Sequence, residues 1–81
     1  LLFAPSPAPR AAYMDAVALI NGGRFEEAVE RLRALGAAIG PNADVLNYLG
    51  FASRKLGRFD AALGYYEQAL ALDPDHRGAH E

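Results

Sequence analysis

The stretch Gly57-Arg58-Phe59-Asp60-Ala61-Ala62-Leu63 repeats a pattern that occurs earlier as Gly23-Arg24-Phe25-Glu26-Glu27-Ala28-Val29. Both stretches give glycine, arginine, phenylalanine, an acid, a variable residue, alanine and a branched aliphatic residue in the same order. Corresponding residues lie 34 positions apart. A duplicated catalytic loop, a duplicated ligand site and a structural repeat would each produce such a pair, so the rest of the chain must decide between them.

Composition restricts the fold and the classes of function. The chain has 81 residues, which suits one small domain, and its 52% hydrophobic content comes largely from alanine and leucine, which favour helices. A net charge of −2 with both signs interspersed gives no indication of a nucleic-acid or anionic-membrane surface. Cysteine is absent, which excludes thiolate chemistry, and no apolar run approaches the roughly 20 residues of a membrane-spanning helix. We therefore expect neither nucleic-acid binding nor membrane insertion.

The first nine residues, Leu1 to Pro9, differ from the rest because prolines alternate with small residues. Such a segment favours extended polyproline conformation and indicates a linker or tail. The end of a cleaved secretory signal is the alternative, although three apolar residues carry little weight for it. The compartment therefore stays open between cytoplasm and bacterial periplasm. The chain begins with Leu1 rather than methionine, which is compatible with a piece of a longer protein.

From Arg10 onward, the apolar residues recur with helical spacing in four stripes. The breaks between stripes fall at 21–23, at Gly36 and at Gly57, and the fourth stripe ends at 73–74. The Asn21-Gly22 pair is interpreted as a left-handed helix stop rather than a hairpin turn. Asn42 and Asp75 stand where N-caps belong, each directly after a proline. The pattern predicts four antiparallel helices, with residues 77–81 starting a fifth.

A packing role explains the repeated strings. Glycine inside a helix costs about 1 kcal/mol relative to alanine, so Gly50 in the third stripe indicates a close helix crossing, predicted to be against Ala62. Phe25 and Phe59 begin the second helix of each pair, where a ring can wedge between neighbouring helices. The repeated strings are therefore predicted to form a turn between helices, a phenylalanine ring packed between neighbouring helices and a close helix crossing, rather than a catalytic or ligand-binding site.

These residues resemble the tetratricopeptide repeat, a 34-residue helix-turn-helix unit. The match is carried by Leu46, Leu49, Gly50, Gly57, Phe59, Ala62, Tyr66, Ala69 and Pro74. The resemblance, which extends to short bacterial proteins of this kind, implies an all-α fold: a short right-handed α-solenoid of antiparallel helix-turn-helix repeats. It divides the chain into a tail at 1–9, a degenerate unit at 10–42, a second unit at 43–76 and the start of a third unit or capping helix at 77–81. The first unit departs from the pattern at Asp15, where the signature has leucine.

In this family the first helices of successive repeats line a concave groove that takes a peptide. Carried over to this sequence, the groove positions are Arg10, Tyr13, Val17, Ile20 and Asn21 in the first unit and Asp44, Asn47, Phe51, Arg54 and Lys55 in the second. Exposed aromatics beside arginine and asparagine suit peptide binding. The alternative is that Tyr13 and Val17 pack under the tail or between copies of the protein. Arg54 and Lys55 could also form a solvated helix face.

Other chemistries are poorly supported. His76 and His80 have metal-compatible spacing, but too few ligands accompany them for a zinc site. Some family members hold a carboxylate with lysine and asparagine at positions that carry Tyr13, Val17 and Tyr48 here, which argues against that clamp. Ser6 and Ser53 have no histidine placed to activate them, and no phosphate-binding loop is present. We expect no enzymatic activity, no metal and no cofactor.

Two functions remain. The first is a non-catalytic scaffold that binds a protein or peptide partner in the groove. The second is a self-assembly unit that meets its own copies through exposed repeat ends, because about three repeats are normally needed to cover their apolar faces. Uncovered surface is expected on Tyr65, Leu70 and Leu72.

Overall fold

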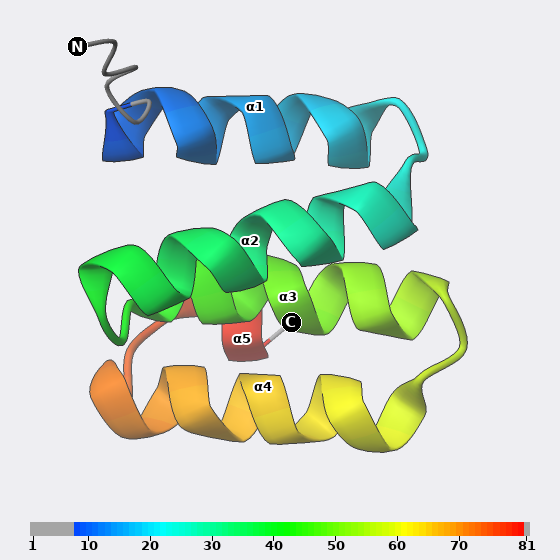
Figure 1. Ribbon diagram of the computed structural model, residues 1–81. Coiled ribbons are helices and arrows are strands. Elements are labelled where there is room, and N and C mark those ends of the chain that lie inside the picture. Colours follow the sequence, from blue (N-terminus) through cyan, green and yellow to red (C-terminus); the bar gives the residue numbers. More distant parts are fainter. Residues whose placement is uncertain (1–7, 81) are drawn as a thin grey trace, which may run out of the picture.

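The computed structural model describes residues 8–80, with Arg77 and His80 described by their backbones alone. Five helices follow one another: α1 (Pro9–Asn21), α2 (Phe25–Ile39), α3 (Ala43–Lys55), α4 (Phe59–Leu72) and α5 (Arg77–His80). Successive long helices run antiparallel, and the short α5 lies beside α3 and α4 (Figure 1). No strand occurs within residues 8–80. The predicted all-α helical repeat is confirmed.

The two repeated strings form identical helix-to-helix turns. At the first turn, Gly23 N–H donates to the Ile20 carbonyl at 3.0 Å and Arg24 N–H donates to the Leu19 carbonyl at 2.8 Å. At the second turn, Gly57 and Arg58 make the same two bonds, at 2.9 and 2.8 Å. This pair of bonds is the Schellman motif, whose left-handed position favours glycine. Gly23 and Gly57 occupy it with φ of 77° and 80°, so the left-handed stop lies at Gly23 rather than at the predicted Asn21-Gly22 pair.

The end of α2 differs from its prediction. Gly36 lies inside the helix, which continues to Ile39 and stops at Gly40 with φ of 84°. A Cβ placed at Gly36 would make an ordinary van der Waals contact with the Val45 side chain of α3 at 4.0 Å, so the packing of α3 on α2 does not require glycine here.

One of the two predicted N-caps is confirmed. Asn42 Oδ1 accepts a hydrogen bond from the Val45 N–H at 3.0 Å at the start of α3. Asp75 does not cap α5, because its own N–H donates to Asp73 Oδ1. His76 takes the cap position, and its Nδ1 accepts from the Ala79 N–H at 3.2 Å. His76 lies 34 residues after Asn42, so the cap obeys the same repeat as the turns.

The core consists of small and branched side chains from the first three helices. Its fully buried members include Ala16, Ala28, Leu32 and Ala52. At the equivalent of Ala16 in the second unit, Gly50 faces a different partner from the predicted Ala62. A Cβ at Gly50 would lie 2.8 Å from the ring of Tyr66. Tyr66 is the counterpart of Leu32, so the larger ring of the second unit requires the smaller residue opposite it.

The two phenylalanine wedges differ. Phe25 lies edge-on to Phe51 of α3, with ring centroids 6.3 Å apart. Phe59 is 67% exposed, so the prediction that it wedges between helices is wrong for the second unit. Among the described residues, no ring lies against Phe59 as Phe51 lies against Phe25.

Candidate functional site

A cavity of about 320 Å³ opens between the long helices and α5. Its lining comes from the end of α1, the middle of α3, one residue of α4 and one of α5: Ile20, Asn21, Asn47, Tyr48, Phe51, Arg54, Tyr66 and Gly78. Five of the ten predicted groove residues line it: Ile20, Asn21, Asn47, Phe51 and Arg54. Apolar rings thus lie beside amide and guanidinium donors, and none of the described lining residues is acidic.

Two cationic side chains, Arg54 and Lys55, lie beside the Phe51 ring at one side of the cavity. The ring is fixed by the contact with Phe25, and the two cations lie close to it: Arg54 Cζ is 5.6 Å and Lys55 Nζ is 5.4 Å from the ring centroid. Cation–π attraction at exposed sites contributes about 0.5–1 kcal/mol. Neither cation forms an ion pair with a described residue, so both remain available to a ligand.

The beginning of α5 closes one side of the cavity. Gly78 lies so close to Asn47 that an added Cβ would be 2.6 Å from the Asn47 amide nitrogen. His76 holds this turn through its two ring nitrogens. Nδ1 accepts from Ala79 N–H, which leaves Nε2 to donate to Asp44 Oδ1 at 2.7 Å. The predicted groove residue Asp44 is therefore already engaged with α5.

The match to a known protein family falls on the second helix pair. Residues 43–76, which contain α3 and α4, match the tetratricopeptide repeat model. Residues 43–76 are thus a tetratricopeptide repeat. A search among curated proteins found no match.

The presence of this repeat has a general consequence for function. Tetratricopeptide repeats are non-catalytic modules that mediate protein–protein interactions. Among the described residues, no three potential metal ligands cluster, and no helix has the length and apolar character needed to cross a bilayer.

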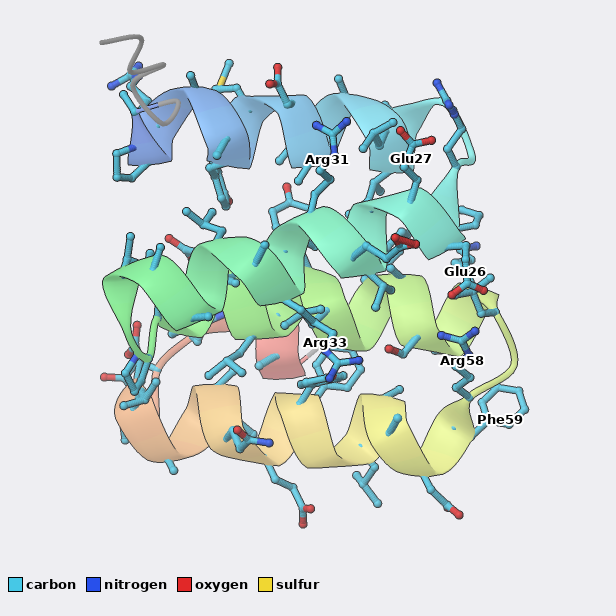
Figure 2. The ribbon with its side chains drawn as sticks, viewed as in Figure 1. Glu26, Glu27, Arg31, Arg33, Arg58 and Phe59 are labelled. Atoms are coloured by element: carbon cyan, nitrogen blue, oxygen red, sulfur yellow. The ribbon has the colours of Figure 1, made fainter. Side chains whose placement is uncertain are left out.

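The turns between the paired helices hold the arginines of the duplicated strings, Arg24 and Arg58. Arg58 NH2 lies 2.6 Å from Glu26 Oε2, which links the second unit to the first, while Arg24 pairs with Glu27 inside the first unit. Figure 2 shows Glu26 and Arg58 pointing toward each other beside the turn between α3 and α4. Exposed pairs of this kind contribute at most about 1 kcal/mol. Both arginines thus have partners at the turns, away from the cavity.

Tyr13 occupies a separate surface. It is half-buried and lies edge-on to Tyr48, with centroids 5.8 Å apart. It lines a smaller cavity with Arg10 and Asp44 rather than the main one. Tyr13 and Phe51 were expected to lie off the core, but both pack against it. Burial, followed by the proximity of Tyr48 and Asp44, raises the pKa of Tyr13 from 10.0 to about 12.

A tyrosinate titration tests this environment. Because the folded pKa of Tyr13 lies above its unfolded value, the neutral phenol stabilises the fold fully below pH 10, and this contribution is lost as the pH rises toward 12. We expect absorbance titration to show a tyrosine with a pKa of about 12 that is absent from Tyr13→Phe. If Tyr13→Phe instead loses a tyrosine that titrates near 10 and keeps the one near 12, the assigned packing is contradicted.

The remaining predicted residues fall outside the main cavity. Val17 is half-buried on α1, and Lys55 is exposed beside Phe51. Ile20 lines the cavity but is only 7% exposed, so it also belongs to the core. Sequence reasoning missed Tyr48, Tyr66 and Gly78 as lining residues. The sequence could have indicated Tyr66, because it stands at a signature position of the repeat. The position of Gly78 could not be inferred, because it depends on how α5 packs against the other helices.

Proposed function

We propose that the chain is a scaffold module that binds a segment of another protein in the cavity between α1, α3, α4 and α5. The observation that carries this proposal is an apolar floor beside hydrogen-bond donors that pair with none of the described side chains. Phe51 and Tyr66 offer ring surface, while Asn47 and Arg54 offer directional hydrogen bonds. Specific sites generally combine apolar surface with a few placed polar groups in this way.

The other predicted residues would extend the same site along the first helices. Tyr13 and Val17 lie on α1, Asp44 lies at the start of α3, and Lys55 ends α3 beside Arg54. An extended segment crossing α1, α3 and α5 would contact one or more of them. The proposed units are 10–42 and 43–76, so the cavity spans the boundary between units and depends on both.

Two single substitutions of arginine by glutamate test the proposal. Peptides are selected from a displayed random library against the parent chain. They are expected to bind Arg54→Glu at least about tenfold more weakly, because the glutamate cannot donate a hydrogen bond and repels the acceptor groups that Arg54 would contact. Arg33→Glu is the matched control, since Arg33 is an exposed arginine on α2 that forms no ion pair with a described residue and lies outside the cavity (Figure 2). Fluorescence polarisation with labelled peptides measures both.

Two results would count against the cavity. One is selection of peptides that bind both variants as tightly as the parent chain. The other is equal loss of affinity in Arg33→Glu, which would indicate a general charge effect. Circular dichroism on each variant separates lost binding from lost folding.

A second candidate function is self-assembly through exposed repeat ends. The specific observation in its favour is the exposure of large apolar side chains on α4, where Phe59 is 67% and Leu63 is 59% exposed. Of the three residues expected to be uncovered, Leu72 is 50% exposed, whereas Tyr65 packs against the core and Leu70 is half-buried. The mass of the purified chain, measured by light scattering over a range of concentrations, tests this candidate.

A further inference from the structure

The main cavity differs in charge from three other cavities of the structure. Each of those three has at least one acidic residue in its lining: Asp15 and Glu27 in one, Asp15 in another and Asp44 in the third. Among the described lining residues of the main cavity, Arg54 is the one that carries a charge. The chain as a whole has a net charge of −2, so this cavity has the opposite sign to the molecule that contains it.

The cations beside the main cavity are positioned before any ligand arrives. Arg54 Cζ lies 5.6 Å and Lys55 Nζ lies 5.4 Å from the centroid of the Phe51 ring, and that ring packs edge-on against Phe25. Both cations are exposed, and neither forms an ion pair with a described residue. Groups that are already positioned lose less conformational entropy when a ligand binds them. The two side chains are therefore prepared for a negatively charged group.

The repeat itself does not require cations at these two positions. The equivalents of Arg54 and Lys55 in the first unit are Ile20 and Asn21, 34 residues earlier, and they end α1 in the same way. Positive charges favour the C-terminal end of a helix, yet α1, α2 and α4 have no basic residue in their last turns. Because the fold forms helix ends without cations, the two charges that end α3 indicate a role in binding.

Asp44, the acidic residue of α3, does not cancel these charges. It lies near the start of the helix, ten positions before Arg54, which corresponds to about 15 Å along the helix axis. Exposed charges separated by more than about 8 Å are largely screened at physiological ionic strength. The Asp44 carboxylate is also engaged, since its Oδ1 lies 2.7 Å from His76 Nε2. Asp44 therefore leaves the positive charge at the other end of α3 in place.

We propose that the segment bound in the main cavity is acidic, with a side-chain carboxylate between Arg54 and Lys55 and an apolar side chain on Phe51 and Tyr66. This inference rests on the function proposed above and adds the chemistry of the partner. A protein segment fits better than a nucleic acid, because two adjacent cations on a chain of net charge −2 cannot neutralise a run of phosphates.

The spacing along α3 limits the bound segment. Arg54 follows Asn47 by seven positions, or two turns, so the two residues lie about 10 Å apart along the helix axis. An extended chain advances about 3.3 Å per residue, so the carboxylate and the group that Asn47 binds are about three residues apart in the segment. Phe51 lies between Asn47 and Arg54 on α3, and all three line the cavity. The apolar side chain of the segment therefore falls between its two polar groups.

Peptides from a displayed random library, selected against the parent chain, test the acidic partner. Peptides whose binding is weakened by Asn47→Ala, which changes no charge, are taken as cavity binders. They are expected to contain more Asp and Glu than the starting library, with an apolar residue within three positions. Exchanging the acidic residue of a synthetic peptide for its amide should weaken binding to the parent chain at least about tenfold. Against Arg54→Gln/Lys55→Gln, the same exchange should change binding by less than about twofold.

Arg31→Gln/Arg33→Gln is the matched control, because it removes the same charge from α2, outside the cavity (Figure 2). Glu27 keeps its contact with Arg24 when Arg31 is replaced. All four substituted cations are exposed, so both double variants should keep the parent helix content by circular dichroism. The control variant is expected to distinguish the acidic peptide from its amide as strongly as the parent chain does.

Each other outcome contradicts a defined claim. Cavity binders that show no excess of acidic residues, or that tolerate the exchange to the amide, would overturn the acidic partner and leave the binding module standing. Equal loss of discrimination in the Arg31/Arg33 control would overturn the assignment to Arg54 and Lys55. A labelled single-stranded oligonucleotide that binds the parent chain more tightly than the peptides would overturn the choice of a protein segment. If no selected peptide depends on Asn47 or Arg54, the proposed function itself is contradicted.

Discussion

Leu32→Ala is expected to lower the free energy of unfolding by about 2–5 kcal/mol, which is a large share of the stability of a domain of this size. Leu32 is fully buried at the centre of the core cluster formed by the first three helices. Removing its side chain takes away apolar contacts and leaves a cavity that close-packed helices cannot fill completely. Thermal unfolding followed by circular dichroism should show a Tm lower by at least about 10 °C.

Leu63→Ala is the matched control for this measurement. It removes the same atoms from a helix position that is 59% exposed, so the stability should change by no more than about 0.5 kcal/mol in dilute samples. Equal losses in the two variants would contradict the assignment of the core. A Leu32→Ala chain that melts at the parent temperature would contradict it as well.

Gly50→Leu is expected to cost about 3 kcal/mol, at the upper end of the range for overpacked sites. Three ring atoms of Tyr66 lie within 2.9 Å of the place that a Cβ would take at Gly50. Leucine adds three further carbon atoms, and its better helix propensity recovers only about 1 kcal/mol. Urea unfolding of the parent and the variant measures the difference.

A double substitution distinguishes this contact from a general intolerance at position 50. Gly50→Ala combined with Tyr66→Leu gives the second unit the pair that the first unit carries as Ala16 and Leu32. Since that pair is fully buried in the first unit, the double variant should lie within about 1 kcal/mol of the parent. If it is as unstable as Gly50→Leu, the ring of Tyr66 is not the reason for the glycine.

Local patterns predicted most of the fold. The four stripes and the two Gly-Arg-Phe turns depend on residues close in sequence, and the helix order follows from them. The errors occur where a residue on another helix decides the outcome. Gly50 accommodates the ring of Tyr66 rather than Ala62, and Phe59 remains exposed.

The candidate site was less predictable. Five of the ten expected groove residues line one cavity, but Asp44 is engaged by His76 and Tyr13 packs on Tyr48. These partners come from other helices, and a pattern within one helix contains no information about them. The roles of all ten residues in binding stay predictions.

The sequence by itself determined the two turns, the helix order and the repeat of 34 residues. It could not determine what the repeated residues do, because the same residue in the same local context has different surroundings in each unit. Phe25 lies edge-on to Phe51 of α3, whereas Phe59 is 67% exposed. Secondary structure follows from local backbone preferences and periodicity, but burial is a property of neighbours. Only the tertiary structure therefore separates the Gly-Arg-Phe string that fixes the core from the one that leaves an apolar face uncovered.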